Sequence, residues 1–201
     1  MDFKELLVSS WHRTIGSIGP LLLSTFTMVL VSVCSFGILA PVAMAGYTQS
    51  LLRMIKEDRE PKVGDLFSEM RLFLPLFVFF LLSTIVVAIG FVMLVLPGIV
   101  VGIFLTFAGF YLLPLMTDKR LGLIDALKES WAMAMAQPVS DHIIVVILFL
   151  VLTSLGSSLP FAFLITQPIA TFVLLGAYLK RDVDAADRSV STPPPPPPPA
   201  D

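Results

Sequence analysis

Three long stretches of this chain contain no Asp, Glu, Lys, Arg or His residue. They are Thr14–Leu52, Leu72–Thr117 and Ile143–Leu179, which are 39, 46 and 37 residues long. The hydrocarbon core of a bilayer takes about 20 helical residues to cross. Each stretch is therefore too long for one membrane span and long enough for two.

Helix-breaking residues near the middle of each uncharged stretch predict a turn there. The three turn sequences are Gly37-Ile-Leu-Ala-Pro41, Leu96-Pro97-Gly98 and Gly156-Ser-Ser-Leu-Pro160. Proline lacks a backbone N–H and glycine is conformationally permissive, so both interrupt helices. The sequence therefore predicts three helical hairpins, at about 18–55, 74–117 and 142–179. Hairpins that enter the bilayer without crossing it are the alternative, since the second half of the first one, residues 41–55, is short.

The basic residues decide between single crossings and hairpins. All 13 Lys and Arg residues lie between or outside the uncharged stretches. Three hairpins would keep all of them on one side of the membrane, whereas single crossings would spread them over both sides. The positive-inside rule favours the hairpins and puts the basic loops in the cytoplasm. We therefore expect an all-α polytopic membrane protein with six transmembrane helices and with both termini in the cytoplasm.

The composition agrees with a membrane protein and excludes several other classes. Only 14% of the residues are charged, against about 25% in an ordinary soluble domain. The net charge of -2 gives no reason to expect a nucleic-acid partner. The single cysteine, Cys34, lacks the second ligand that a metal or redox motif needs. Ala43-Met44-Ala45 fits a signal-peptide cleavage pattern, but the apolar run before it is too long, so we expect the first hairpin to be retained.

A short amphipathic segment precedes each predicted hairpin, with apolar residues three or four positions apart. In the first and third segments, Leu7-Val-Ser-Ser-Trp11 aligns with Leu127-Lys-Glu-Ser-Trp131. Tryptophan and amphipathic helices settle at the level of the lipid headgroups. We therefore expect an interfacial helix before each hairpin, with Trp11 and Trp131 as interfacial anchors. Coincidence among generic amphipathic linkers is the alternative.

The C-terminal segment changes character after the last hairpin. A membrane domain of residues 1–181 is expected to give way at 182–201 to a disordered cytoplasmic tail. This tail ends in the proline run Pro193–Pro199, which favours an extended polyproline helix. We expect a semi-rigid extension, and a polyproline-binding domain is the candidate partner in the alternative reading.

The uncharged stretches lack the groups that membrane enzymes and ion-coupled transporters use. Their serines have no histidine or lysine beside them to act as a base, and no metalloprotease or hydrolase motif occurs. The two histidines, His12 and His142, are expected to reach the water boundary at the membrane surface. The acidic loop residues are expected to form solvated helix faces; they are Asp65, Glu69, Asp118, Asp125, Glu129 and Asp141. We therefore expect no enzyme, cofactor or metal.

The apolar segments instead carry residues typical of helix packing. Small residues allow membrane helices to approach closely. The predicted packing residues are Gly98 and Gly102 in a G-x-x-x-G motif, Gly109, Ala43 and Gly46. Gln49 and Gln167 are the most polar groups within the predicted spans. They are expected either to hydrogen-bond between helices or to line a small polar cavity.

Three sequence features between residues 60 and 140 resemble a known family. They are Leu96-Pro-Gly-Ile99, Pro114-Leu-Met-Thr-Asp118 and the segment LGLIDALKESW at residues 121–131. They resemble a family of bacterial membrane proteins that is similar to the membrane domain of some glycerophosphodiester phosphodiesterases. In that family a Pro-Gly turn joins two spans and a cytoplasmic Ala-Leu-x-x-Ser helix follows. The resemblance implies a membrane fold and a bacterial inner-membrane location, and it brings no catalytic residues.

Two functions from different classes follow from these expectations. The first is a non-enzymatic inner-membrane protein that scaffolds, regulates or assists envelope proteins through helix packing. Its partners would be membrane lipids and either another membrane protein or a second copy of the chain. The alternative is a permease or lipid-handling protein that is not ion-coupled. A closed bundle would favour the first, and a continuous apolar groove near Gln49 or Gln167 would favour the second.

Overall fold

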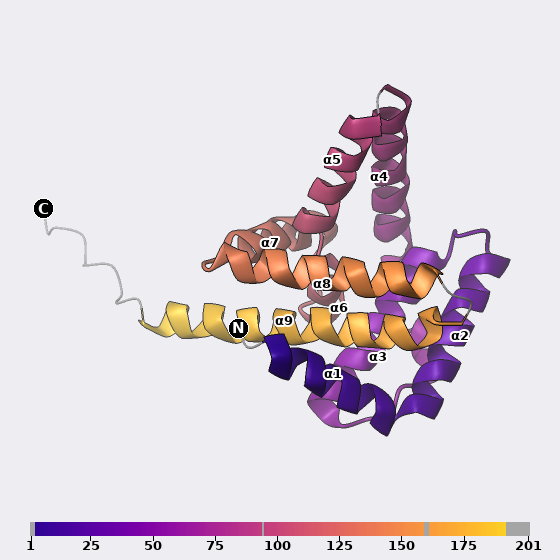
Figure 1. Cartoon of the computed structure of the whole chain (residues 1–201), viewed down its shortest axis with the longest axis vertical. Coiled ribbons are helices and arrows are strands. Elements are labelled where there is room, and N and C mark those ends of the chain that lie inside the picture. Colours follow the sequence, from indigo (N-terminus) through magenta and orange to yellow (C-terminus); the bar gives the residue numbers. More distant parts are fainter. Residues whose placement is uncertain (1–2, 94, 159–160, 192–201) are drawn as a thin grey trace, which may run out of the picture.

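The structure, a computed structural model, describes residues 3–93, 95–158 and 161–191. Of these described residues 86% are helical, and no strand occurs among them (Figure 1). In chain order the elements are α1 (Phe3–Gly16), α2 (Ile18–Cys34), α3 (Ala40–Glu57), the 3-10 turns η1 (Val63–Phe67) and η2 (Met70–Leu72), α4 (Phe73–Met93), α5 (Val95–Ala108), α6 (Leu112–Asp118), α7 (Leu123–Met135), α8 (Val139–Ser158) and α9 (Phe163–Ser191).

Four helical segments within the described residues are long and apolar enough to cross a membrane. They are Val63–Met93, Val95–Asp118, Val139–Ser157 and Phe163–Asp187. A fifth candidate exists if α1 and α2, which are bent by 91° relative to each other, are counted together. α3 is not a candidate, because its last residues include Arg53, Lys56 and Glu57. The all-helical prediction with several apolar helices is confirmed, whereas six spans are not.

Consecutive helices are in contact as the pairs α2–α3, α4–α5 and α8–α9, but the pairs do not share one direction. α4 and α5 lie side by side and project from the rest of the molecule (Figure 1). α8 and α9 also lie side by side, and in the same view they run across the direction of α4 and α5. The parallel arrangement of hairpins that a six-span bundle requires is therefore not confirmed.

The prolines of the first two predicted turns lie in the helices that follow the turns. Pro41 occupies the first turn of α3, and Pro97 lies in the first turn of α5. A helix tolerates proline in its first turn because the missing N–H would have no partner there. The first turn therefore lies before Pro41, between Cys34 and Ala40. Gly156 of the third predicted turn also lies within a helix, α8.

The core lies where α3, α6 and α9 meet below the α4–α5 hairpin. Its largest fully buried side chains include Tyr47, Tyr111 and Tyr178, one from each of α3, the α5–α6 junction and α9. In the most apolar part of the segment Phe163–Asp187, 61% of the residues are buried, whereas in that of Val63–Met93 only 11% are buried. α9 is thus a core helix, and α4 presents its apolar side chains to the surroundings.

The predicted interfacial segments and tail have different outcomes. The first and third segments are the helices α1 and α7, but the second consists of the 3-10 turns η1 and η2. In η1 the Asp65 carboxylate accepts a hydrogen bond from the Lys62 backbone N–H, a local bond that competes with a regular helix. Residues 182–191, assigned to the tail from the sequence, continue α9, since they contain neither proline nor glycine. The run Pro193–Pro199 lies outside the described residues.

Candidate functional site

An ion-paired cluster joins α3, α6 and α9 at the base of the core. Lys56 Nζ donates to both carboxylate oxygens of Asp118, at 2.7 and 2.8 Å. Tyr178 Oη donates to the same carboxylate at 2.8 Å. One carboxylate therefore holds a side chain from each of two other helices. Asp118 acts here as a bridge between helices, a role that its place in an expected loop did not indicate.

A second carboxylate, Asp65, fixes η1 against α3. It accepts hydrogen bonds from Ser50 Oγ at 2.8 Å and from the Arg59 guanidinium, and Arg53 lies 4.0 Å away. Gly46 makes this approach possible, because a Cβ there would lie 2.3 Å from the Leu66 carbonyl oxygen. The expectation that Asp65 is solvated is wrong. Its partners come from the preceding helix α3 and the loop after it, and pairing allows the carboxylate to be buried.

Glu69 is buried in the same way beside the start of α4. Its carboxylate accepts a hydrogen bond from Arg71 Nε at 3.0 Å. The Arg71 guanidinium also donates to the Met116 carbonyl of α6 at 3.2 Å. The predicted solvated position of Glu69 is therefore also wrong, since a cation held by α6 accompanies the carboxylate into the interior.

His142 closes a break between α5 and α6. The break spans Gly109 to Tyr111 and frees two carbonyl groups of α5. His142 Nε2 lies 3.2 Å from the Phe107 carbonyl oxygen, and Nδ1 lies 3.2 Å from the Tyr111 hydroxyl. Because a carbonyl only accepts, Nε2 carries the proton and Nδ1 accepts from the tyrosine. His142 is fully buried, so the expectation that it reaches water is wrong; His12 is exposed on α1.

Ser130 of α7 completes the same break. Its hydroxyl donates to the Ala108 carbonyl oxygen at 2.6 Å and accepts from the Tyr111 backbone N–H at 3.2 Å. Both nitrogens of His142 and the Ser130 hydroxyl are therefore engaged in holding the broken helix. Irregular backbone within an apolar region needs such internal partners.

Arg181 ties α9 to the end of α7. Its guanidinium donates to the carbonyl oxygens of Met133 at 2.5 Å and Ala136 at 2.8 Å, and to that of Pro138 at 3.1 Å. The side chain is buried, and a cation at a helix C-terminus is favoured by the helix dipole. From the sequence, Arg181 counted only as a basic residue beyond the last span.

These polar groups form a structural network. Each of the three buried carboxylates lies in an ion pair or hydrogen bond with a neighbouring helix or turn. Within the described residues, no group of three or more His, Cys, Asp or Glu could hold a metal ion. The remaining candidate surfaces are the apolar depressions between the helices.

Two adjoining apolar depressions lie beside α4. The first, of about 380 Å³, is enclosed by α2, the α2–α3 turn, α3 and α4. The second, of about 480 Å³, lies between α4 and α5. Phe80 and Thr84 line both, and we call the two adjoining depressions together the α4 groove. The hydroxyls of Thr84 and Thr106 donate to carbonyls of their own helices at 2.8 and 2.9 Å, which leaves the groove largely apolar.

The predicted packing glycines have different roles. A Cβ at Gly90 would lie 2.9 Å from Gly98 Cα, so these two glycines allow α4 and α5 to touch. By contrast, a Cβ at Gly102 would have nothing within 4 Å, and Gly102 lines the α4 groove. Gly109 lies in the break after α5, where a Cβ would be 3.0 Å from the Leu105 carbonyl oxygen. Ala43 is fully buried on α3, one turn before Gly46.

Of the two glutamines, Gln167 lies near the α4 groove. Gln167 is buried on α9, and its Nε2 lies 3.6 Å from Met44 Sδ of α3. Met44 also lines the first depression, so Gln167 lies behind the wall of the α4 groove. The Oε1 atom of Gln49 is buried without a hydrogen-bond partner.

The two predicted anchors, Trp11 and Trp131, are both partly exposed. Trp11 lines an apolar depression of about 420 Å³ between α1 and the α8–α9 pair. The Trp131 ring packs against Phe104 and Phe107 of α5, with centroids 5.7 and 6.2 Å apart. Contact with α5 therefore sets the position of α7 relative to the α4–α5 hairpin.

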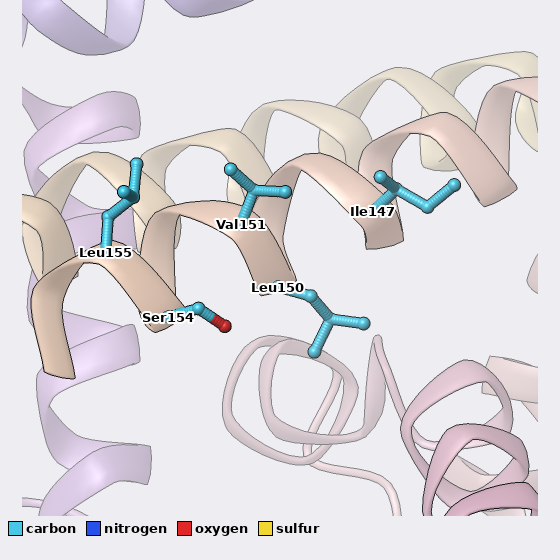
Figure 2. A pocket seen from close by; sticks show the side chains of 5 residues that line it. All are labelled: Ile147, Leu150, Val151, Ser154 and Leu155. Atoms are coloured by element: carbon cyan, nitrogen blue, oxygen red, sulfur yellow. The ribbon is translucent and has the colours of Figure 1, made fainter. Parts of the chain in front are cut away.

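α8 carries a further apolar depression of about 320 Å³ on its outer face. Figure 2 shows its five lining residues along α8: Ile147, Leu150, Val151, Ser154 and Leu155. All come from one helix, so this depression is an open surface.

Comparisons of the chain with protein-family models, with curated proteins and with solved structures find no match.

Proposed function

We propose that this chain is a non-enzymatic protein of the bacterial inner membrane that scaffolds, regulates or assists other membrane proteins. One observation carries the proposal: the α4–α5 hairpin projects from the body and buries little of its apolar surface. Val78, Leu82 and Val86 are among the exposed apolar side chains of α4. Large contiguous apolar surfaces of this kind are typical of membrane and protein interaction sites.

The proposed topology has the α4–α5 hairpin crossing the bilayer from the cytoplasmic side. α4 has 21 residues, and at about 1.5 Å per residue it matches the roughly 30 Å hydrocarbon core. Arg71 precedes α4 and Lys119 follows α6, and the positive-inside rule supports a cytoplasmic position for both. In this proposal both termini are cytoplasmic. The resemblance to the phosphodiesterase membrane domain supports the inner-membrane location.

Six full crossings would require the three hairpins to align along one membrane normal. Because α8 and α9 run across α4 and α5 in Figure 1, we propose one crossing hairpin. In this proposal the α2–α3 and α8–α9 hairpins enter the membrane from the cytoplasmic side, and they are not aligned with α4–α5 along the membrane normal. The apolar outer face of α8 is compatible with contact with acyl chains.

The proposed partner surface is the outer face of α4–α5. Gly102 is open to the surroundings, so the helix of another membrane protein or of a second copy can approach closely there. The test is photo-crosslinking in cells with a photoreactive residue at Val86 of α4. We expect a discrete protein adduct from Val86 and none from the matched exposed apolar position Ile144 of α8. Lipid adducts alone from Val86 would contradict a scaffolding function.

Lipid handling is the second candidate, and the α4 groove favours it. The groove is apolar, lies beside Gln167 through Met44, and adjoins helices proposed to lie in the bilayer. Gly102→Leu would place a side chain in the second depression, where the new Cβ would have nothing within 4 Å. We expect less co-purified phospholipid by native mass spectrometry, whereas Gly19→Leu, at an equally open glycine outside the groove, leaves it unchanged. Equal lipid content in both variants would exclude this function.

A further inference from the structure

The α2–α3 turn reaches only about halfway along α4. Gly37 of the turn and Pro41 of the first turn of α3 line the first depression together with Phe80 and Thr84 of α4. Thr84 lies 11 residues after Phe73, the first residue of α4, which corresponds to about 16 Å along the helix. Figure 1 agrees, because α2 rises from the lowest part of the molecule and ends well below the tip of the α4–α5 hairpin. If α4 crosses the membrane, the turn lies near the middle of the bilayer.

The backbone N–H groups of this turn are all bonded within the turn. Those of residues 35–40 donate to Val31 O, Val33 O, Ser32 O, Ser35 O, Ser35 Oγ and Gly37 O, at distances from 2.7 to 3.2 Å. The carbonyls of Ser35, Gly37 and Leu39 also accept bonds from the turn or from α3. Gly37, with φ of 82°, supplies the left-handed backbone conformation that such a tight turn requires. Its N–H groups therefore do not need water, which meets one part of the requirement for a position in hydrocarbon, where carbonyl groups need partners as well.

The side chains of the turn also suit hydrocarbon. Phe36 is 95% exposed, and Val33 and Ile38 beside it are exposed as well. The only polar side chain between residues 35 and 40 is Ser35. Its hydroxyl donates to Ser32 O at 3.2 Å and accepts from the Leu39 N–H at 3.1 Å. The tip thus presents apolar groups outward and keeps its one hydroxyl bonded inward.

The bend before α2 provides an entry point at the membrane surface. α1 and α2 meet at 91°, and α1 carries the partly exposed Trp11. An amphipathic α1 in the headgroup layer would direct α2 into the bilayer. At the other end of the hairpin, Arg53, Lys56 and Glu57 of α3 require a return to the same polar side.

We propose that the α2–α3 hairpin is re-entrant: its tip, residues 35–40, lies among the acyl chains of the cytoplasmic leaflet and does not cross the bilayer. The lipid of this one leaflet is the partner of Phe36 and its neighbours. The inference rests on the proposal that α4–α5 crosses the membrane. It replaces two of the crossings in the six-span expectation with a hairpin that returns to its side of entry.

The native Cys34 allows a direct test in the full-length chain. It is the only cysteine, it is exposed, and it immediately precedes the turn. A nitroxide on Cys34 is measured by electron paramagnetic resonance in vesicles of phosphatidylethanolamine and phosphatidylglycerol. We expect frequent collisions with oxygen and few with a water-soluble nickel chelate, which is the signature of a position near the bilayer centre. Frequent collisions with nickel would overturn the inference.

Labelling in cells separates this inference from the proposed topology. A membrane-impermeant maleimide is expected to label Cys34 from neither side of the membrane. In a Cys34→Ser background, Val95→Cys at the α4–α5 tip is expected to react from outside, and Asp125→Cys from the cytoplasmic side. Reaction of Cys34 from either side would overturn the re-entrant hairpin and leave the α4–α5 crossing intact. Failure of Val95→Cys to react from outside would instead overturn the proposed crossing of α4–α5.

Discussion

The contact between Gly46 and η1 makes a strong stability prediction. A Cβ at Gly46 would lie 2.3 Å from Leu66 O and 2.5 Å from Asp65 O, and both are backbone atoms that cannot rotate away. Overpacking of this kind costs typically about 1–3 kcal/mol, and we place Gly46→Ala at the upper end because η1 must move. Because alanine has a higher helix propensity than glycine, the replacement also raises the free energy of unfolding by about 1 kcal/mol. The net loss expected is about 2 kcal/mol.

The loss is larger if moving η1 also separates Asp65 from its arginines. Breaking a buried ion pair costs about 3–5 kcal/mol, so about 2 kcal/mol is the lower bound. The assay is reversible unfolding of the purified protein in mixed micelles, followed by circular dichroism. At about 1.4 kcal/mol per factor of ten, the folding equilibrium constant falls by a factor of about 30 or more.

Gly102→Ala is the matched control for this prediction. It makes the same change within a helix, but nothing lies within 4 Å of the new Cβ. Only the difference in helix propensity between alanine and glycine then acts, so we expect Gly102→Ala to stabilise the protein by up to about 1 kcal/mol. Equal effects of Gly46→Ala and Gly102→Ala would refute the argument that close approach of η1 requires glycine.

Three further predictions concern other parts of the molecule. Ser130→Ala leaves two buried backbone groups at the α5–α6 break without their partner and should cost about 1–3 kcal/mol of unfolding free energy; a change under about 0.5 kcal/mol would contradict this. Phe36→Asp places a charge at the re-entrant tip, and a charge at the bilayer centre costs about 2.5–3.5 kcal/mol. Less of this variant than of Phe36→Leu should therefore remain in membranes washed with carbonate. Equal amounts of the two variants would argue against a deep position of the tip. Burial lowers the pKa of Lys119, but hydrogen bonds and charges of Asp182 and Glu129 outweigh it and raise the pKa above 10.5. This stabilisation is present below the unfolded pKa and is lost as the pH rises through the folded pKa, so Lys119→Met should reduce the loss of stability in alkaline solution, measured by pH-dependent unfolding.

The helices of this protein were predictable because their signals are local. The absence of charge over Leu72–Thr117, for example, sets the length of apolar helix that α4 and α5 provide. The spacing of apolar residues around Trp11 and Trp131 likewise predicted α1 and α7. Pro41 and Pro97 marked their turns to within a few residues, since proline is tolerated at the start of the next helix, whereas Pro160 lies outside the described residues.

The buried polar network was not predictable from these local signals. His142 and Asp65 were expected to face water, because a single sequence does not indicate which distant groups will pair with them. His142 meets Tyr111 and the Phe107 carbonyl 31 and 35 residues away in sequence. The burial of His142 depends on hydrogen bonds that exist only once α5, α6 and α8 have packed together, and that of Asp65 depends on the packing of η1 against α3.

The two parts of the G-x-x-x-G motif show the same division. Gly98 is used within the chain, against Gly90 of α4, whereas Gly102 is left open in the α4 groove. The motif predicted small residues for close packing, but it did not indicate which neighbour each glycine would meet. That choice depends on the relative position of α4 and α5.

The sequence by itself determined that this chain is helical and that several helices are apolar enough for a bilayer. These properties depend on the free energy of transferring each segment from water, which sums over its own residues. Only the tertiary structure decided that α8 and α9 run across α4 and α5, and that the α2–α3 turn ends beside the middle of α4. Direction and depth depend on contacts between segments, such as Gly46 with Leu66 and Gln167 with Met44, and no single segment carries that information.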